Sequence, residues 1–188
     1  MSLEELWELF PIELKEYNPN YLNWYLEEAN NIKKSITSCS IKGIHHIGST
    51  AIPELISKPI IDILLEVDED CNVKKLQENL EKQQWILMSK QEEPYWTMVF
   101  NKGYTEEGFA EKIFHLHVRH LGDWPELYFR DYLWKHEEIA NEYGKLKLSL
   151  LEEFRNDRDG YTEAKADFIL EHTAKAREEF GNKYGKKE

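Results

Sequence analysis

The chain has 188 residues, of which 41% are hydrophobic and 32% are charged, a composition typical of globular domains and not of disordered segments. Its formal net charge of −12 opposes contact with phosphate backbones, so we expect no general nucleic-acid binding and favour a small ligand. No apolar run reaches the roughly 20 residues that span a bilayer, and the N-terminus lacks the basic and apolar segments of a signal peptide.

Cellular location is predicted from these features and from the cysteines. Cys39 and Cys71 form neither a CxxC pair nor a zinc-binding spacing. We therefore expect two reduced thiols, as in proteins of a reducing compartment. Together with the absence of a membrane span, this predicts a cytoplasmic protein that does not enter the membrane.

Hydrophobic periodicity predicts the elements up to residue 120 in an alternating order. They are helices at 3–10 and from Asn18-Pro19 onward, a strand at 41–47, a turn at 48–50, a strand at 59–67, a helix at 68–83, strands at 85–88 and 95–101, a loop at 104–110 and a strand at 113–120. Asn18 is expected as the N-cap of the second helix, with Pro19 at its first position.

After Gly122 the hydrophobic period changes to 3.6 residues. This predicts helices at 125–135, 137–154 and 162–180, with a turn at 156–160. We therefore expect an α/β (α+β) fold with a mixed sheet of about five strands, flanked by helices and followed by additional C-terminal helices. Residues 1–188 are expected to form one domain, with the α/β core at 17–120 and the C-terminal helices at 123–180.

The strongest local signal is a Gly-Ser turn between the first two predicted strands. It lies in His45-His46-Ile47-Gly48-Ser49-Thr50-Ala51-Ile52-Pro53, followed by Lys58-Pro59-Ile60-Ile61-Asp62-Ile63. Backbone N–H groups at such a turn bind phosphate oxygens, glycine permits close approach, and hydroxyl groups add donors. Gly48, Ser49 and Thr50 are thus candidate phosphate ligands, and Asp62 on the next strand is a candidate ligand of a divalent metal.

These strings, with four later ones, closely resemble the GrpB family (UPF0157). The later strings are His115-Leu116-His117-Val118, Phe129-Arg130-Asp131-Tyr132-Leu133, Tyr143 with Leu146-Lys147, and Tyr161-Thr162 with Lys165. The resemblance covers residues 17–176. It implies a nucleotidyltransferase-like fold, and members of the family are sometimes fused to a dephospho-coenzyme A kinase.

The metal site that this resemblance implies is incomplete. Nucleotidyltransferases of this fold usually carry a second carboxylate two residues after the first, because residues i and i+2 of a strand share a face. Here that position is Leu64. Glu66 lies on the same face but about 13 Å further along the strand, so we expect it to be a solvated charge at the strand end.

Two histidines take the place of the expected third carboxylate. Alternation on the predicted strand 113–120 puts Ile113, His115, His117 and Arg119 on one face, and Phe114, Leu116 and Val118 on the apolar face. Asp62, His115 and His117 then have the composition of a two-histidine, one-carboxylate site, which favours Mn²⁺, Fe²⁺ or Zn²⁺. Alternatively, the histidines contact ligand phosphate, one of them serves as a general base, or both are structural.

The other candidate residues are one histidine and several basic groups. His46 either orients a ligand or is structural. The cations that could neutralise phosphate are Lys58, Arg130, Lys147 and Lys165, although Arg130 could equally form a salt bridge with Asp131. Lys147 and Lys165 lie on helices rich in charge, where a solvated face is usual.

The sequence favours an enzyme related to nucleotidyltransferases that acts on a small nucleotide or phosphorylated metabolite with a divalent metal. Mg²⁺ or Mn²⁺ is expected before Zn²⁺ or Fe²⁺. In this hypothesis Asp62, His46 and His117 are the catalytic candidates. Two alternatives remain open, a non-catalytic nucleotide- or metabolite-binding module and a transition-metal enzyme that uses Asp62, His115 and His117.

Overall fold

The computed structural model describes residues 2, 5 and 8–186. It contains the predicted mixed sheet of five strands, and their order is β1-β2-β5-β4-β3. The strands are β1 (Ile41–Ile47), β2 (Ile60–Val67), β3 (Ile86–Gln91), β4 (Thr97–Thr105) and β5 (Gly108–His120). β2 pairs in parallel with β5, and the other neighbouring strands are antiparallel.

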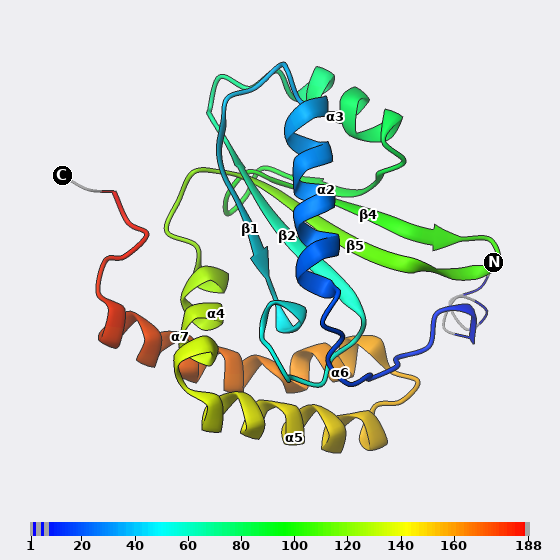
Figure 1. Ribbon diagram of the computed structural model, residues 1–188, viewed down its shortest axis with the longest axis vertical. Coiled ribbons are helices and arrows are strands. Elements are labelled where there is room, and N and C mark those ends of the chain that lie inside the picture. Colours follow the sequence, from blue (N-terminus) through cyan, green and yellow to red (C-terminus); the bar gives the residue numbers. More distant parts are fainter. Residues whose placement is uncertain (1, 3–4, 6–7, 187–188) are drawn as a thin grey trace.

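One face of the sheet is covered by the helices α2 (Tyr21–Ser35) and α3 (Val73–Lys82) (Figure 1). Their apolar side chains form the main core with inward-facing residues of β2, β4 and β5, among them Ile63, Phe100 and Leu116, each with no exposed area. Asn20 is the residue that precedes α2, two positions after the predicted cap, and Asn18 Oδ1 accepts from its amide (2.9 Å).

The remaining helices gather at one end of the sheet (Figure 1). They are α4 (Pro125–Lys135), α5 (Glu137–Glu153), α6 (Arg158–Ala164) and α7 (Ala166–Phe180). Leu127 of α4 packs with Ile47 and Leu64, so α4 covers part of the sheet face opposite α2. A short 3₁₀ turn, η1 (Ser49–Ala51), joins β1 to the segment that leads into β2.

Four predicted elements differ from the observed ones or lie beyond the description. The expected helix at 68–83 begins later, at Val73, as α3. The expected helix at 3–10 lies largely outside the described residues. The expected loop at 104–110 is wrong, because β4 and β5 continue to a tight hairpin in which Tyr104 pairs with Phe109. The expected helix at 162–180 begins earlier, at Arg158, where Asp157 caps α6, and it is interrupted at Lys165.

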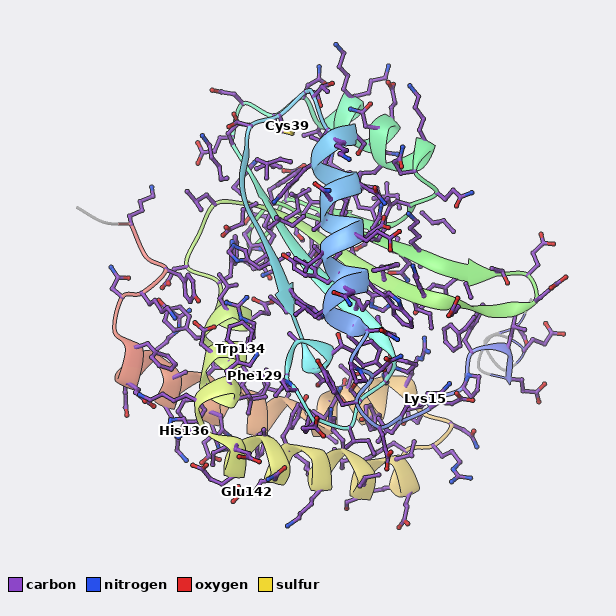
Figure 2. The ribbon with its side chains drawn as sticks, viewed as in Figure 1. Lys15, Cys39, Phe129, Trp134, His136 and Glu142 are labelled. Atoms are coloured by element: carbon purple, nitrogen blue, oxygen red, sulfur yellow. A yellow bond between two sulfur atoms is a disulfide. The ribbon has the colours of Figure 1, made fainter. Side chains whose placement is uncertain are left out.

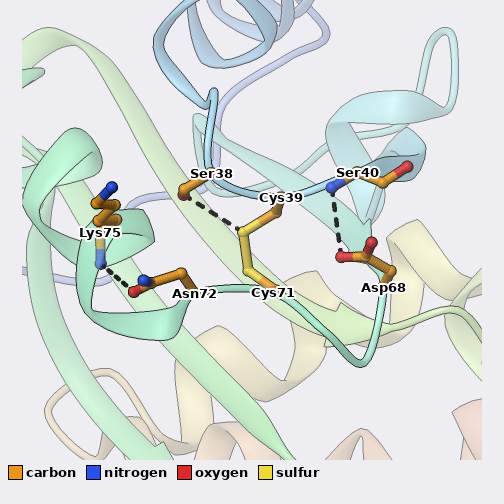
Figure 3. The surroundings of a disulfide bond; sticks show 7 residues. All are labelled: Ser38, Cys39, Ser40, Asp68, Cys71, Asn72 and Lys75. Carbon is orange, nitrogen blue, oxygen red and sulfur yellow. Dashed lines mark hydrogen bonds between the residues drawn. A yellow bond between two sulfur atoms is a disulfide. The ribbon is translucent and has the colours of Figure 1, made fainter.

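The expectation of two reduced thiols is also wrong, because Cys39 and Cys71 form a disulfide (Figure 3). Cys39 precedes β1 and Cys71 follows β2. Since these strands are antiparallel and Ile41 pairs with Val67, the two flanking segments meet, and the two Cα atoms lie 4.5 Å apart. The cysteines therefore no longer argue for a reducing compartment.

None of the helices in the described part of the chain is both long and apolar enough to span a bilayer.

Candidate functional site

The predicted Gly-Ser turn directly adjoins Asp62. Gly48 has φ +72° and ψ −176°, a conformation that is essentially restricted to glycine. A Cβ atom at this position would lie 2.5 Å from Asp62 Oδ2. Glycine is therefore required both by the backbone conformation and by the packing of the Asp62 carboxylate against the turn.

Asp62 and the two predicted histidines come together on one face of the sheet. Asp62 pairs with His115 in the parallel ladder of β2 and β5, and His117 lies two residues further along β5. The Asp62 Oδ1 atom is 3.6 Å from both His115 Nδ1 and His117 Nε2. Phe114, Leu116 and Val118 face the core, so the predicted alternation of β5 is confirmed.

The protonation states at this cluster follow from burial and from neighbouring charges. Burial raises the pKa of Asp62, but the hydrogen bond with His117 and the charges of His115, His117 and His46 outweigh it and hold that pKa below its usual value. Burial lowers the pKa of His115 by more than the Asp62 charge raises it. An ionised carboxylate therefore lies beside a neutral His115 at pH 7.

A cavity of about 320 Å³ opens beside Asp62 and is lined by three lysines. We call it the lysine pocket. Lys58 comes from the segment before β2, Lys147 from α5 and Lys165 from the junction of α6 and α7. Its other lining residues are Ser49, Ser57, Ile60, Asp62, His115, Tyr161 and Thr162.

The three lysines of the lysine pocket have little compensation from acidic groups. Among the described residues, none of them forms an ion pair, unlike other lysines of the chain. Lys147 Nζ instead donates to Ser49 Oγ (3.0 Å), and the ammonium groups of Lys58 and Lys165 lie 4.8 and 4.5 Å from the centre of the Tyr161 ring.

Burial lowers the pKa of all three lysines, and repulsion by neighbouring cations adds to this for Lys58 and Lys147. Burial, followed by the charges of Lys165 and Lys58, lowers the pKa of Lys147 to about 7. Burial, followed by the charges of Lys165 and Arg158, lowers the pKa of Lys58 to about 8. A bound anion would offset the positive charges of Lys58 and Lys165.

Two residues near the cluster gave no signal in the sequence. Tyr104, within the predicted loop, lies 2.7 Å from His115 Nε2 through its hydroxyl group and stacks on that imidazole ring. The positive charge of Arg158 contributes to lowering the pKa of both Lys58 and His115. Both residues reach the site only through the hairpin of β4 and β5 and the early start of α6.

Three predicted site residues, His46, Thr50 and Arg130, do not line the lysine pocket. Thr50 is buried, donates to the Ile60 carbonyl (3.0 Å) and lies 3.0 Å from His46 Nε2. His46 stacks on Tyr25, and burial lowers its pKa to about 4. The hydroxyl of Thr50 is thus already engaged within the protein, and His46 is a buried neutral side chain.

The sequence allowed Arg130 either to bind phosphate or to form a salt bridge with Asp131, and the structure shows the salt bridge. The Arg130 guanidinium donates to Asp131 Oδ1 (3.0 and 2.9 Å) and to the His46 carbonyl (3.1 Å). Together with His46, it lines a different, larger cavity of about 710 Å³, which lies beside Trp134 (Figure 2). Arg130 is therefore not among the cations of the lysine pocket.

The expectation that Glu66 is solvated is wrong. Its side chain is only 4% exposed, its carboxylate lies 3.1 Å from His45 Nε2, and it accepts from the Gly122 amide (3.3 Å). Because β2 lies between β1 and β5, both neighbouring segments cover the end of the strand. Glu66 is bound there and does not replace the missing second carboxylate near Asp62.

The cluster has the donor chemistry of a metal site without its closed geometry. Asp62, His115 and His117 supply one oxygen and two nitrogen donors, as transition metals prefer. Donor atoms around a metal with bonds of about 2.1 Å lie roughly 3.0–3.4 Å apart, slightly closer than the 3.6 Å observed. In the described residues, no group of three or more His, Cys, Asp or Glu side chains is arranged to hold a metal ion. Metal binding would thus require a small inward movement of the histidines.

Replacing Gly48 by alanine should cost about 1–3 kcal/mol of the free energy of unfolding from backbone strain, and should also displace Asp62. Urea unfolding measures the first effect. Gly181→Ala is the matched control, because Gly181 has φ +62° but no atom within 4 Å of an added Cβ. If the two variants lose equal stability and bind ligands equally well, the contact between Gly48 and Asp62 is unimportant.

The fold and the cluster define a mixed α/β protein with a polar site where a Gly-Ser turn meets a strand carboxylate. The family model described as GrpB protein matches residues 11–175, and the chain therefore belongs to the GrpB family.

Similar proteins support this assignment along most of the chain. The glutamate-rich protein GrpB of Alkalihalophilus pseudofirmus is 32% identical over 79% of this chain and 88% of its own length. The UPF0157 protein YqkA of Bacillus subtilis is 29% identical over 90% of this chain, which spans only about half (48%) of that relative. The crystal structure of conserved protein GrpB from Enterococcus faecalis superposes with a TM-score of 0.77, at 29% identity, over 89% of this chain and 99% of that one.

Proposed function

We propose that this protein binds a small phosphorylated ligand, such as a nucleotide, in the lysine pocket and transfers a phosphoryl or nucleotidyl group beside Asp62. The observation that carries the proposal is the convergence of Lys58, Lys147 and Lys165 on one cavity, with no ion pair to any of them in the described part of a chain of net charge −12. Clustered cations of this kind bind phosphate through charge-assisted hydrogen bonds.

The arrangement around Asp62 supports transfer chemistry. Gly48 and Ser49 form a turn against the strand that carries Asp62, an order that resembles nucleotidyltransferase-like enzymes. Asp62, with His115 and His117, would hold a divalent metal, which supplies charge neutralisation at the phosphoryl group. The lysines would bind and orient the phosphate, so that catalysis rests on positioning and electrostatics. If His117 is not a metal ligand, it would serve as the general base.

A second candidate is a binding module without turnover. It is favoured by Leu64, which fills the position of the second carboxylate and has no exposed area. Such a module would use the lysine pocket alone, and its ligand affinity would not depend on metals.

A third candidate is a transition-metal enzyme, favoured by the equal 3.6 Å distances from Asp62 to the two histidines. Only this candidate requires Zn²⁺, Mn²⁺ or Fe²⁺ to be retained through purification, which elemental analysis measures.

Isothermal titration with inorganic phosphate and with ATP tests the proposal. Lys165→Gln should weaken phosphate binding by roughly 10- to 100-fold, because a hydrogen bond to a charged group contributes about 1.5–3 kcal/mol. Lys145→Gln is the matched control, since it removes the same charge from an exposed position on α5 outside the lysine pocket. Equal affinities in these two variants would count against the lysine pocket.

Asp62→Asn separates transfer from simple binding. In EDTA, loss of this negative charge should leave phosphate affinity unchanged or increase it, because like charges repel. With Mg²⁺ or Mn²⁺ present, the variant should lose any metal-dependent gain in ATP affinity. A wild-type ATP affinity that is indifferent to both metal and Asp62 would favour the binding module.

A further inference from the structure

Ser49 and Lys147 form a pair that phosphate binding alone does not require. Ser49 Oγ lies 3.0 Å from Lys147 Nζ, and Ser49 faces the lysine pocket at the start of η1. Lys147 is only 2% exposed and comes from α5, nearly one hundred residues later in the chain. A rigid turn and a packed helix thus hold a hydroxyl and an amine in hydrogen-bond contact.

The surroundings of Lys147 favour its neutral form. The cations facing it are Lys58 and Lys165, which repel its charge. The ring of Tyr143, 4.7 Å from the Lys147 ammonium group, acts in the opposite direction through a cation–π contact, and burial outweighs it. The remaining ionisable side chains that line the cavity are Asp62, His115 and Tyr161. Burial and the charges of Lys165 and Lys58 lower the pKa of Lys147 to about 7. An appreciable fraction of its amine can therefore accept a proton at neutral pH.

The same cavity can present an electrophile to Ser49. Lys58 and Lys165 do not contact Ser49 in the described hydrogen bonds, so both remain available to bind the oxygens of a phosphoryl group. Negative charge that develops on those oxygens during attack would be stabilised by two cations in a partly enclosed site. The chemical class that fits is a phosphate ester.

We propose that Ser49 is a nucleophile, with Lys147 as its general base, and that it attacks phosphate esters bound in the lysine pocket. The Ser49 Oγ–P bond forms while the bond from phosphorus to the ester oxygen breaks. Lys147 takes the Ser49 proton and passes it to the departing oxygen, which leaves as an alcohol. Water then hydrolyses the phosphoserine and regenerates Ser49 with release of phosphate. This inference rests on the proposed phosphate site and adds a covalent step to it.

Labelling with an alkyl fluorophosphonate tests the nucleophile directly. The Ser49 Oγ–P bond forms, the P–F bond breaks, fluoride leaves, and Lys147 accepts the proton. We expect a mass adduct that maps to Ser49 in the wild type and is absent in Ser49→Ala. Lys147→Arg should label about 100-fold more slowly, because a guanidinium cannot act as a base at neutral pH. Lys145→Arg is the matched control on the same helix and should label at the wild-type rate.

The pH dependence gives a second readout that a structural role for Lys147 would not produce. Lys147 is protonated below its pKa and neutral above it, so the labelling rate should rise with pH. The rise should be centred near pH 7, with most of the change between about pH 6 and pH 8. In Lys147→Arg this rise should disappear.

Each outcome decides the inference. A wild type that carries no adduct at Ser49 overturns it, and so does labelling of Lys147→Arg at the wild-type rate. Phosphate titration of the same samples then shows which proposal has failed. If phosphate still binds in a Lys165-dependent manner, only the nucleophile is excluded, and if phosphate does not bind, the proposed function fails as well. Thermal unfolding of Ser49→Ala and Lys147→Arg serves as the control that both variants are folded.

Discussion

Replacing Arg130 by methionine should lower the free energy of unfolding by about 3–5 kcal/mol and leave phosphate affinity unchanged. Arg130 is 8% exposed and binds Asp131, the His46 carbonyl and the Tyr184 hydroxyl. Its removal leaves the buried Asp131 with Lys183 as its remaining cation, and removing one partner of a buried ion pair is strongly destabilising. Urea unfolding measures the first part of the prediction and phosphate titration the second.

The double variant Arg130→Met/Asp131→Leu is the control for this prediction. Removal of both charges is expected to recover part of the lost stability, because apolar replacement of a buried ion pair is often close to neutral. The recovery should be incomplete, since Lys183 also binds Asp131 (2.7 Å). A stable Arg130→Met variant with weakened phosphate binding would contradict this prediction. It would show that Arg130 binds the ligand, one of the two roles that the sequence allowed.

Reduction of the disulfide between Cys39 and Cys71 should cost about 3–4 kcal/mol, because the crosslink closes a long loop in the unfolded chain. The cysteines are separated by 32 residues, and the bond joins the start of β1 to the end of β2. Urea unfolding with and without a reducing agent measures the difference, and Cys39→Ser/Cys71→Ser should match the reduced wild type.

The double serine variant also supplies the control for this second prediction. A reducing agent should not change the free energy of unfolding of this variant. Any change that is seen would come from an effect of the reagent other than reduction of this disulfide. Phosphate affinity should be the same in oxidised, reduced and variant proteins, because the disulfide lies at the end of the strands away from Asp62. Equal stability of the reduced and oxidised wild type would show that the crosslink does not constrain the chain.

Much of the site on the sheet could be predicted because strand geometry is local. The alternation of β5 places His115 and His117 opposite the buried Phe114 and Leu116, as expected from a period of two residues. The apolar run of β2 and the Gly-Ser turn likewise predict that Asp62 lies beside Gly48. The alternation within one strand holds over a few residues, so short-range sterics and periodicity are enough to predict it. The contact of Gly48 with Asp62 also needs the pairing of β1 with β2.

The sequence by itself thus determined the mixed α/β class, the five strands, the family, and the strand faces on which Asp62 and the two histidines lie. Only the tertiary structure decided which cations share the site. It brings Lys147 and Lys165 to Ser49 and Asp62, turns Arg130 inward to Asp131, and joins Cys39 to Cys71. Each of these contacts depends on how distant segments pack and on which face of a helix is buried. The order of charges and residue types along the chain does not by itself predict that packing.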